Sequence, residues 1–170
     1  VSDIPSQTIP EGSTFDTINL DNYVEDIEDP DEYITWTYSG NSELTVSIID
    51  RIATITIPEE NWDGAETITF TTEDNDTATD FDEATFTVTY VNDPPVVSDI
   101  RSEKIPEGKT CSTMSLDNYV EDIEDPDEYI TWTYSGNSEL TVSIIDRIAT
   151  ITITEENWNG PETIKITTED

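Results

Sequence analysis

Histidine is absent from this 170-residue sequence, and cysteine occurs only once, at Cys111. Without histidine, the chain lacks the usual general base of enzymes and the usual ligand of transition metals. A single cysteine cannot form a disulfide within the chain. These absences argue against a transition-metal centre and against a fold held together by disulfides.

Basic residues and long apolar runs are also scarce. The chain has 6 Lys and Arg residues against 40 Asp and Glu residues, a formal net charge of −34. Nucleic acids and anionic membrane surfaces are bound by basic patches, so neither is an expected partner. No apolar run is long enough to cross a bilayer, so we expect no membrane insertion in this segment. Because the first residue is Val1 and not methionine, we expect a mature or internal part of a longer protein.

The sequence contains two copies of one unit, with Val97 as the counterpart of Val1. Residues Leu20–Ile57 are identical to Leu116–Ile153 over 38 residues. The second copy runs to Asp170 and contains no counterpart of residues 75–96. A repeat of this length is typical of tandem domains. We therefore expect a first domain over residues 1–94 with a linker at 91–96, and a second, C-terminally incomplete domain over residues 97–170.

Apolar residues alternate with threonine in short runs, which is typical of β-strands with one buried face. Threonine is β-branched and polar, so it suits the outward face of a strand. No stretch has convincing helical spacing. Phe86, Val88 and Tyr90 are the expected core residues of the last strand of the first copy. The alternation predicts strands at Asp3–Ile9, Thr14–Leu20, Tyr33–Tyr38, Leu44–Ile49, Ile52–Ile57, Thr67–Thr72 and Ala84–Val91.

This strand pattern predicts an all-β fold of two tandem seven-stranded antiparallel Greek-key sandwiches, the second lacking its last strand. Trp36 is expected in the core, and Trp62 with Gly64 is expected to close one end of the sandwich. Cys111 stands where the first copy has Phe15, and we expect it to be a small apolar core residue. The second copy would have an unpaired edge. Either the next residues of a longer array or a strand donated by a neighbouring molecule could supply the missing strand. We expect the longer array to supply it.

The densest charge lies at residues 21–32, where seven of twelve residues are Asp or Glu, and it returns unchanged at residues 117–128. Carboxylates this close repel one another unless they stay solvated or share a cation. A solvated surface loop and adaptation of the protein to high salt would each also produce acidic residues in such numbers. Salt adaptation should spread them over strand faces, whereas here they gather in the connections. The pattern therefore favours binding of Ca²⁺.

The connections of a sandwich alternate between its two ends, which predicts where these oxygens meet. The C-terminal end of the first copy and the N-terminal end of the second should face each other across the linker. Calcium takes six to eight oxygen ligands, mostly from carboxylates and carbonyls. The predicted calcium ligands at this junction are Glu11, Glu60, Asn92, Asp93, Asp122, Asp125, Asp127 and Asp170. Those that would serve a preceding repeat are Asp26, Asp29, Asp31, Asp74 and Asp76.

Five motifs follow one another in the first copy: Tyr23-Val24, Asp29-Pro30-Asp31, Pro58-Glu59-Glu60-Asn61-Trp62-Asp63-Gly64, Thr72-Glu73-Asp74 and Asn92-Asp93-Pro94-Pro95. In this order they resemble the cadherin-like, immunoglobulin-fold tandem repeats of large prokaryotic cell-surface and adhesin proteins. In addition, Pro10-Glu11-Gly12 is similar to the Pro-Glu motif that opens a cadherin domain. The resemblance implies calcium at the domain junctions and an extracellular location at the cell surface.

Together, these features predict a calcium-rigidified structural spacer repeat of a long extracellular surface protein, adhesin or filament. The expected partners are neighbouring repeats of the same array or other copies of the chain itself. An alternative is an adhesive binding module that recognises a glycan or a surface protein, although no distinctive loop interrupts the repeat. We do not expect an enzyme, because paired catalytic carboxylates need a cleft that convex sandwich ends do not readily provide.

Overall fold

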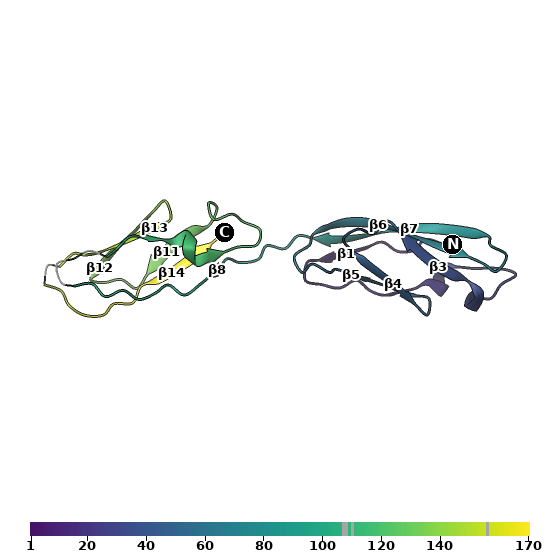
Figure 1. The fold of residues 1–170 in the computed structure, drawn as a ribbon, viewed down its shortest axis with the longest axis horizontal. Helices are drawn as coiled ribbons and strands as arrows, with labels where there is room; N and C mark the ends of the chain where they lie inside the picture. The colour runs from purple at the N-terminus through teal and green to yellow at the C-terminus, as the bar shows by residue number, and fades with distance from the viewer. Residues whose placement is uncertain (107–108, 110, 156) are drawn as a thin grey trace. The chain divides into compact units, whose positions relative to one another are not determined.

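The computed structural model describes residues 1–106, 109, 111–155 and 157–170. The chain divides into two compact units, Val1–Val91 and Asn92–Asp170, here called unit 1 and unit 2 (Figure 1). Across the described ranges, regular structure consists of β-strands and short 3₁₀ helices, so the prediction of an all-β fold is confirmed. No helix in these ranges is long and apolar enough to span a membrane.

Unit 1 contains two sheets, with strand orders β1-β7-β6-β3 and β2-β5-β4 (Figure 1). The strands pair antiparallel, except that β1 runs parallel to β7. The prediction of an entirely antiparallel sandwich is wrong for this pair, because alternation shows which face is buried and not the direction of pairing. The strands are β1 Gln7–Pro10, β2 Ile18–Asn19, β3 Thr35–Ser39, β4 Thr45–Ile49, β5 Ile52–Thr56, β6 Gly64–Glu73 and β7 Thr79–Thr89.

Several strand boundaries differ from those predicted. The predicted second strand is reduced to β2. It ends at Asn19, because the Asn19 side chain accepts the backbone N–H of Asp21 and begins the 3₁₀ helix η1 (Leu20–Tyr23). A second 3₁₀ helix, η2 (Asp31–Tyr33), precedes β3. Strand β6 pairs with β7 along its whole length, from Gly64 opposite Val88 to Glu73 opposite Thr79. Their connection is therefore short, and the acidic residues expected in it, such as Asp80 and Asp82, lie on β7.

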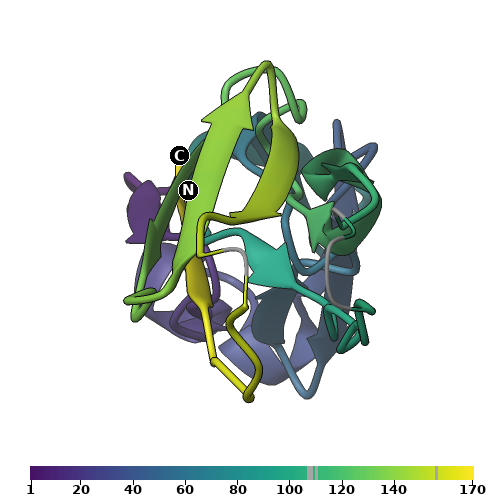
Figure 2. The same ribbon diagram turned by 90° about the vertical axis from the view of Figure 1, so that its left-hand side faces the viewer.

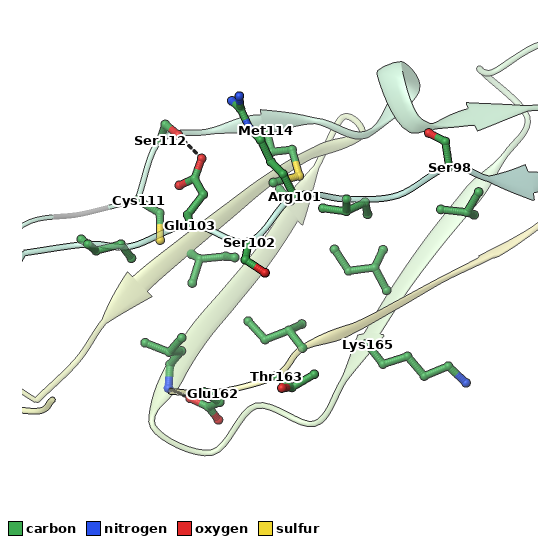
Figure 3. A pocket seen from close by; sticks show the side chains of 18 residues that line it. Ser98, Arg101, Ser102, Glu103, Cys111, Ser112, Met114, Glu162, Thr163 and Lys165 are labelled. Atoms are coloured by element: carbon green, nitrogen blue, oxygen red, sulfur yellow. Dashed lines mark hydrogen bonds between the residues drawn. The ribbon is translucent and has the colours of Figure 1, made fainter. Parts of the chain in front are cut away.

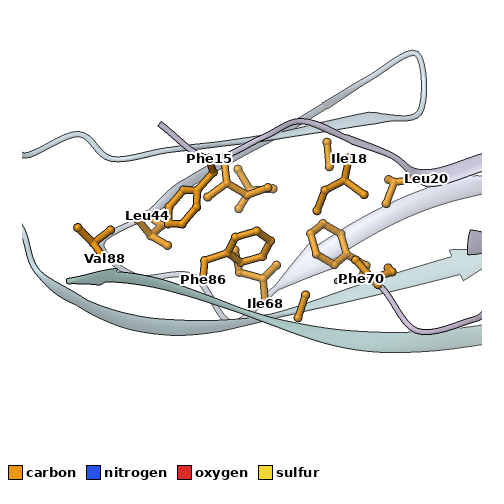
Figure 4. Packing of buried hydrophobic residues seen from close by; sticks show 13 residues of the cluster. Phe15, Ile18, Leu20, Leu44, Ile68, Phe70, Phe86 and Val88 are labelled. Atoms are coloured by element: carbon orange, nitrogen blue, oxygen red, sulfur yellow. The ribbon is translucent and has the colours of Figure 1, made fainter. Parts of the chain in front are cut away.

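The core of unit 1 lies between the two sheets and is centred on aromatic side chains (Figure 4). Phe86 of β7 is fully buried and makes edge-to-face contacts with Phe15 and Phe70, at ring-centroid distances of 5.3 and 6.5 Å. The expectation for Tyr90 is wrong, because it follows the end of β7 and its exposed fraction is 51%. Trp36 is only half-buried and packs at the edge of this core.

Glu66 of β6 is a buried carboxylate that closes the turn before β4. Its oxygens accept the backbone N–H groups of Ser42 at 3.0 Å, Glu43 at 2.7 Å and Leu44 at 3.1 Å, and also the Ser42 hydroxyl. Burial raises the pKa of Glu66, but these hydrogen bonds outweigh it and lower the pKa below its ordinary value. The ionised form is therefore the one that the fold stabilises.

A two-residue turn joins β4 to β5. Asp50 and Arg51 have φ angles of 50° and 61°, as a type I′ hairpin turn requires at both central positions. The turn presents Arg51, whose Nε donates to the Asp21 carboxylate at 2.6 Å. This ion pair ties the hairpin to η1.

Unit 2 has smaller sheets: β10-β8, β11-β14 and β12-β13-β9. Figure 2 shows the antiparallel β12–β13 pair, in yellow-green, on one face of this unit. A 3₁₀ helix, η3 (Leu116–Tyr119), lies between β9 and β10. The strands are β8 Val96–Val97, β9 Met114–Ser115, β10 Val120–Glu121, β11 Thr131–Ser135, β12 Leu140–Ile145, β13 Ile148–Ile153 and β14 Lys165–Glu169.

In the described part of unit 2, more than one strand of unit 1 lacks an equivalent. Residues 103–106 correspond to β1 and residues 160–164 to the first half of β6, and neither segment forms a strand. In unit 1 these two segments pair with β7 alone. Besides the predicted absence of the last strand, these two segments of unit 2 therefore form no strand, because both neighbours of that strand lack its hydrogen-bonding groups.

Candidate cation site

The side chain of Asp122 shapes the acidic loop that follows β10 in unit 2. Its Oδ1 accepts the backbone N–H of Glu124 at 3.0 Å and that of Asp125 at 2.7 Å. Short acidic side chains commonly close a turn in this way, by accepting amide groups two or three residues further along. These two local hydrogen bonds hold the loop from Asp122 to Asp125 in its turn.

Three carboxylates of unit 2 converge beside this turn. Oxygens of Asp122, Asp125 and Asp170 all lie within 4.8 Å of one another. Asp122 and Asp125 come from the loop, whereas Asp170 directly follows β14. Two oxygens bound to one Ca²⁺ at about 2.3–2.6 Å can lie at most about 5 Å apart, so one calcium ion fits this spacing.

The charge of this cluster is not balanced by the arginine ion pairs of the described chain, which join Arg51 to Asp21 and Arg147 to Asp117. The Oδ2 atom of Asp122 is buried and accepts no hydrogen bond from any described residue. A buried carboxylate oxygen without a partner is costly unless a cation or water satisfies it. The donor set and this unsatisfied oxygen both fit a hard cation such as Ca²⁺.

Two residues of the predicted linker lie beside the same loop. Asn92 Nδ2 donates to the Asp170 carboxylate at 2.8 Å, and the backbone N–H of Asp93 donates to Glu124 Oε2 at 3.4 Å. Glu124 was not among the predicted ligands, and its only signal in the sequence is its place in the acidic loop. Asp127 is exposed and lies outside the cluster, in a turn where its carbonyl accepts the N–H of Ile130.

Unit 1 uses the identical loop differently. Asp26 accepts the N–H of Asp29 at 2.7 Å, as Asp122 does for Asp125. However, the Asp29 carboxylate accepts both the N–H and the side-chain amide of Asn75, at 3.3 and 3.2 Å. Asp74 in turn accepts the N–H of Ala78 at 2.8 Å. Among the described residues, no three acidic side chains within unit 1 bring their oxygens within 4.8 Å of one another.

The remaining predicted ligands are spread over unit 1. Asp31 is exposed at the start of η2, and Asp76 is exposed in the turn between β6 and β7. Glu60 is exposed in the turn that follows β5. Glu11 follows β1, and its Oε2 accepts the backbone N–H of Val91 at 3.2 Å. Within unit 2, the structure therefore gathers Asp122, Asp125 and Asp170 and places Asn92 and Asp93 beside their loop, whereas the predicted ligands of unit 1 are spread apart.

Neither a protein-family model nor a curated protein matches the chain. Among solved structures, it is similar to protocadherin gammaB7 EC3–6, with 17% identity over 99% of this chain and 45% of that one, and a TM-score of 0.44. Drosophila N-cadherin EC1–4 shares 12% identity over 98% and 46%, with a TM-score of 0.47. An I-band fragment of titin shares 11% identity over 98% and 62%, with a TM-score of 0.33. The chain spans less than half the length of the two cadherin structures, and the likeness concerns the fold.

Proposed function

We propose that this chain is a spacer repeat of an extracellular surface protein, and that Ca²⁺ bound at the acidic end of unit 2 stiffens it. The observation that carries the proposal is the convergence of Asp122, Asp125 and Asp170, together with the buried Oδ2 of Asp122, which accepts no hydrogen bond from any described residue. The repeated sequence supports a mechanical role, because near-identical units can each perform the same task along an array. Neighbouring repeats are the partners that such an array requires.

The calcium ion would act by neutralising repulsion. Three carboxylates within 4.8 Å destabilise the loop as long as all of them carry charge. Calcium modules outside the cell bind with Kd values of about 10⁻⁴ to 10⁻³ M, which suits an extracellular role. At free calcium about a hundred times Kd, binding stabilises the folded state by about 2.7 kcal/mol. For a unit of this size, that corresponds to a rise in Tm of about 10–20 °C.

Thermal unfolding with Ca²⁺ or EDTA tests the proposal. The wild-type chain should melt higher in calcium, and Asp125→Asn should remove most of that rise. The matched control is Asp29→Asn, which changes the same position of the identical loop in unit 1. There the carboxylate accepts two hydrogen bonds from Asn75. Asp29→Asn should keep the calcium-dependent rise in the Tm of unit 2.

Two results would contradict this function. One is a melting curve that EDTA leaves unchanged at low ionic strength. The other is an equal loss of the calcium response in Asp125→Asn and Asp29→Asn, because unspecific screening of a net charge of −34 would treat the two positions alike. The stiffening role is tested separately by small-angle scattering, which gives the distribution of interatomic distances. We expect calcium to narrow the long-distance end of this distribution.

A further inference from the structure

The outer strands of the two sheets of unit 1 form a seam along one side of the unit. Strand β3 ends the sheet β1-β7-β6-β3, and β4 ends the sheet β2-β5-β4 (Figure 1). Each of them has one edge without a ladder partner among the described residues. Between them lies an open groove of about 430 Å³, lined by Trp36, Thr37, Tyr38, Val46, Ser47 and Ile48.

This seam carries almost no charge, although the chain as a whole is strongly acidic. Residues 33–49 span β3 and β4 and contain one charged residue, Glu43, whereas 27% of the whole chain is charged. By contrast, the cavity of about 490 Å³ in unit 2 is lined in part by charged side chains, namely Arg101, Glu103, Glu162 and Lys165 (Figure 3). Because two molecules with a net charge of −34 repel each other, an uncharged surface is where a second copy can approach.

Strand β4 also lacks the features that usually keep sheet edges apart. Natural proteins protect an outer strand with lysine or another charge, with proline or with a bulge. Residues Thr45–Ile49 contain neither charge nor proline, and they pair with β5 residue for residue, without a bulge. Ile49 of β4 is 69% exposed, and Tyr38 of β3 is 41% exposed. The edge is thus open to pairing with another strand.

Unit 2 presents the same surface. Residues 129–145 are identical in sequence to residues 33–49, and β12 is the outer strand of its sheet, as β4 is in unit 1. Ile145 and Tyr134 are 67% and 41% exposed, close to their counterparts in unit 1. In both units a buried indole N–H, of Trp36 or Trp132, donates to no described residue. Each chain therefore offers two copies of one uncharged edge, each beside a buried donor that still lacks a partner.

The turn between β4 and β5 determines which backbone groups point outward from β4. In a two-residue hairpin, the residues that flank the turn, here Ile49 and Ile52, exchange hydrogen bonds with each other. Bonded and non-bonded pairs alternate along an antiparallel ladder, so Ser47 also bonds to β5, whereas Val46 and Ile48 direct their N–H and C=O groups to the free edge. Two β4 strands that pair antiparallel about Ser47 place Val46 opposite Ile48, and each such pair can exchange two hydrogen bonds.

We propose that a second copy of this chain covers the seam, by pairing its β4 antiparallel with β4 of the first copy. The contact is isologous, with Ser47 of one copy opposite Ser47 of the other on the twofold axis. It joins the two β2-β5-β4 sheets into one and closes the grooves that Trp36 and Tyr38 line. The antiparallel direction places Glu43 at opposite ends of the contact in the two copies, so these like charges do not meet. Strand β12 pairs in the same way about Ser143.

Sedimentation of the whole chain in EDTA tests this contact, because EDTA removes any association through calcium. The wild-type chain should form dimers and larger species as its concentration rises, since each copy carries two edges. Raising NaCl from about 0.02 to about 0.5 M should strengthen the association, because salt screens the repulsion between two acidic molecules. A contact made by ion pairs would respond to salt in the opposite direction.

Paired substitutions test the register. Ser47→Lys together with Ser143→Lys should weaken association about fivefold, because like charges then lie directly opposite each other on neighbouring strands. Ser47→Glu together with Ser143→Glu should weaken it by a similar factor. An equimolar mixture of the two variants should restore it, because a lysine of one copy then faces a glutamate of the other. The control is Thr54→Lys together with Thr150→Lys, which adds the same charge one strand further from the edge and should associate at least as well as wild type.

The proposal is overturned if the wild-type chain stays monomeric at about 1 mM in about 0.5 M NaCl, since a second copy then does not cover the seam. It is also overturned if salt weakens the association, or if the lysine variant at Ser47 and Ser143 associates as well as the control. A lysine–glutamate mixture that associates no better than either variant alone would refute the assigned register. None of these results depends on the calcium site.

Discussion

Replacing Glu66 by glutamine tests how strongly a single buried carboxylate holds unit 1 together. The carboxylate is 9% exposed and accepts three backbone N–H groups and one hydroxyl. Glutamine keeps the shape, but it turns one acceptor oxygen into an NH₂ group that faces backbone donors. Hydrogen bonds to charged groups contribute about 1.5–3 kcal/mol each. Because glutamine keeps one acceptor oxygen, only some of these bonds are lost, and we expect the free energy of unfolding of unit 1 to fall by about 3 kcal/mol.

The assay is thermal and urea unfolding of the whole chain, followed by a signal specific to unit 1. A loss of about 3 kcal/mol should lower the Tm of this unit by about 10–20 °C. The control is Glu162→Gln, at the same position of unit 2, where the carboxylate is only half-buried and accepts the equivalent N–H groups of residues 138–140. We expect a smaller loss of stability from Glu162→Gln, because solvent can reach the backbone donors that the substitution leaves without a carboxylate acceptor.

The pH dependence of the same variant has a definite sign. The folded state lowers the pKa of Glu66, so its contribution to stability is fully present above the pKa of an unfolded glutamate. That contribution is lost as the pH falls through the lowered, folded-state pKa. The stability gap between wild type and Glu66→Gln should therefore shrink in acid. A gap that is below about 1 kcal/mol at pH 7, or that widens in acid, would refute the stabilising role assigned to this carboxylate.

Three other substitutions test the packing of unit 1. Phe86→Ala should cost about 3–5 kcal/mol in urea unfolding, because the ring is fully buried; a loss below about 1 kcal/mol would contradict the assigned core. Gly40→Ala would place Cβ 2.5 Å from a β6 carbonyl oxygen at φ +97°, so it should lower Tm more than Gly12→Ala, which meets open space. Asp21→Asn breaks the ion pair with half-exposed Arg51 and should lower Tm far less than Phe86→Ala, with a still smaller effect at high salt.

The strands could largely be predicted from the sequence, because alternation of threonine with apolar residues is a local signal. The predicted β4 and β5 regions, for instance, agree with the structure to within a residue at each end. Pairing is not local, and the parallel β1–β7 ladder could not be read from alternation. The exposure of Tyr90 has a similar cause, since alternation continues past the point where β7 loses its partner.

The candidate site shows the same limit more sharply. The loops that contain Asp29 and Asp125 are identical in sequence. The Asp29 carboxylate accepts a hydrogen bond from Asn75, whereas an oxygen of Asp125 lies within 4.8 Å of oxygens of Asp122 and Asp170. The sequence of the loop predicts the turn, because the turn is made by one side chain and the amides that follow it. The loop sequence alone does not distinguish the two copies, because the convergence of Asp125 with Asp170 also depends on a residue far away in the chain.

The central claim, a calcium site at the end of unit 2, is tested most directly by isothermal titration with Ca²⁺ at low ionic strength. We predict saturable binding in the range of about 10⁻⁴ to 10⁻³ M. This binding should be lost in Asp122→Asn and Asp125→Asn and retained in Asp29→Asn. The absence of binding at millimolar calcium, or equal binding by the Asp122→Asn and Asp125→Asn variants and the wild-type chain, would contradict the claim.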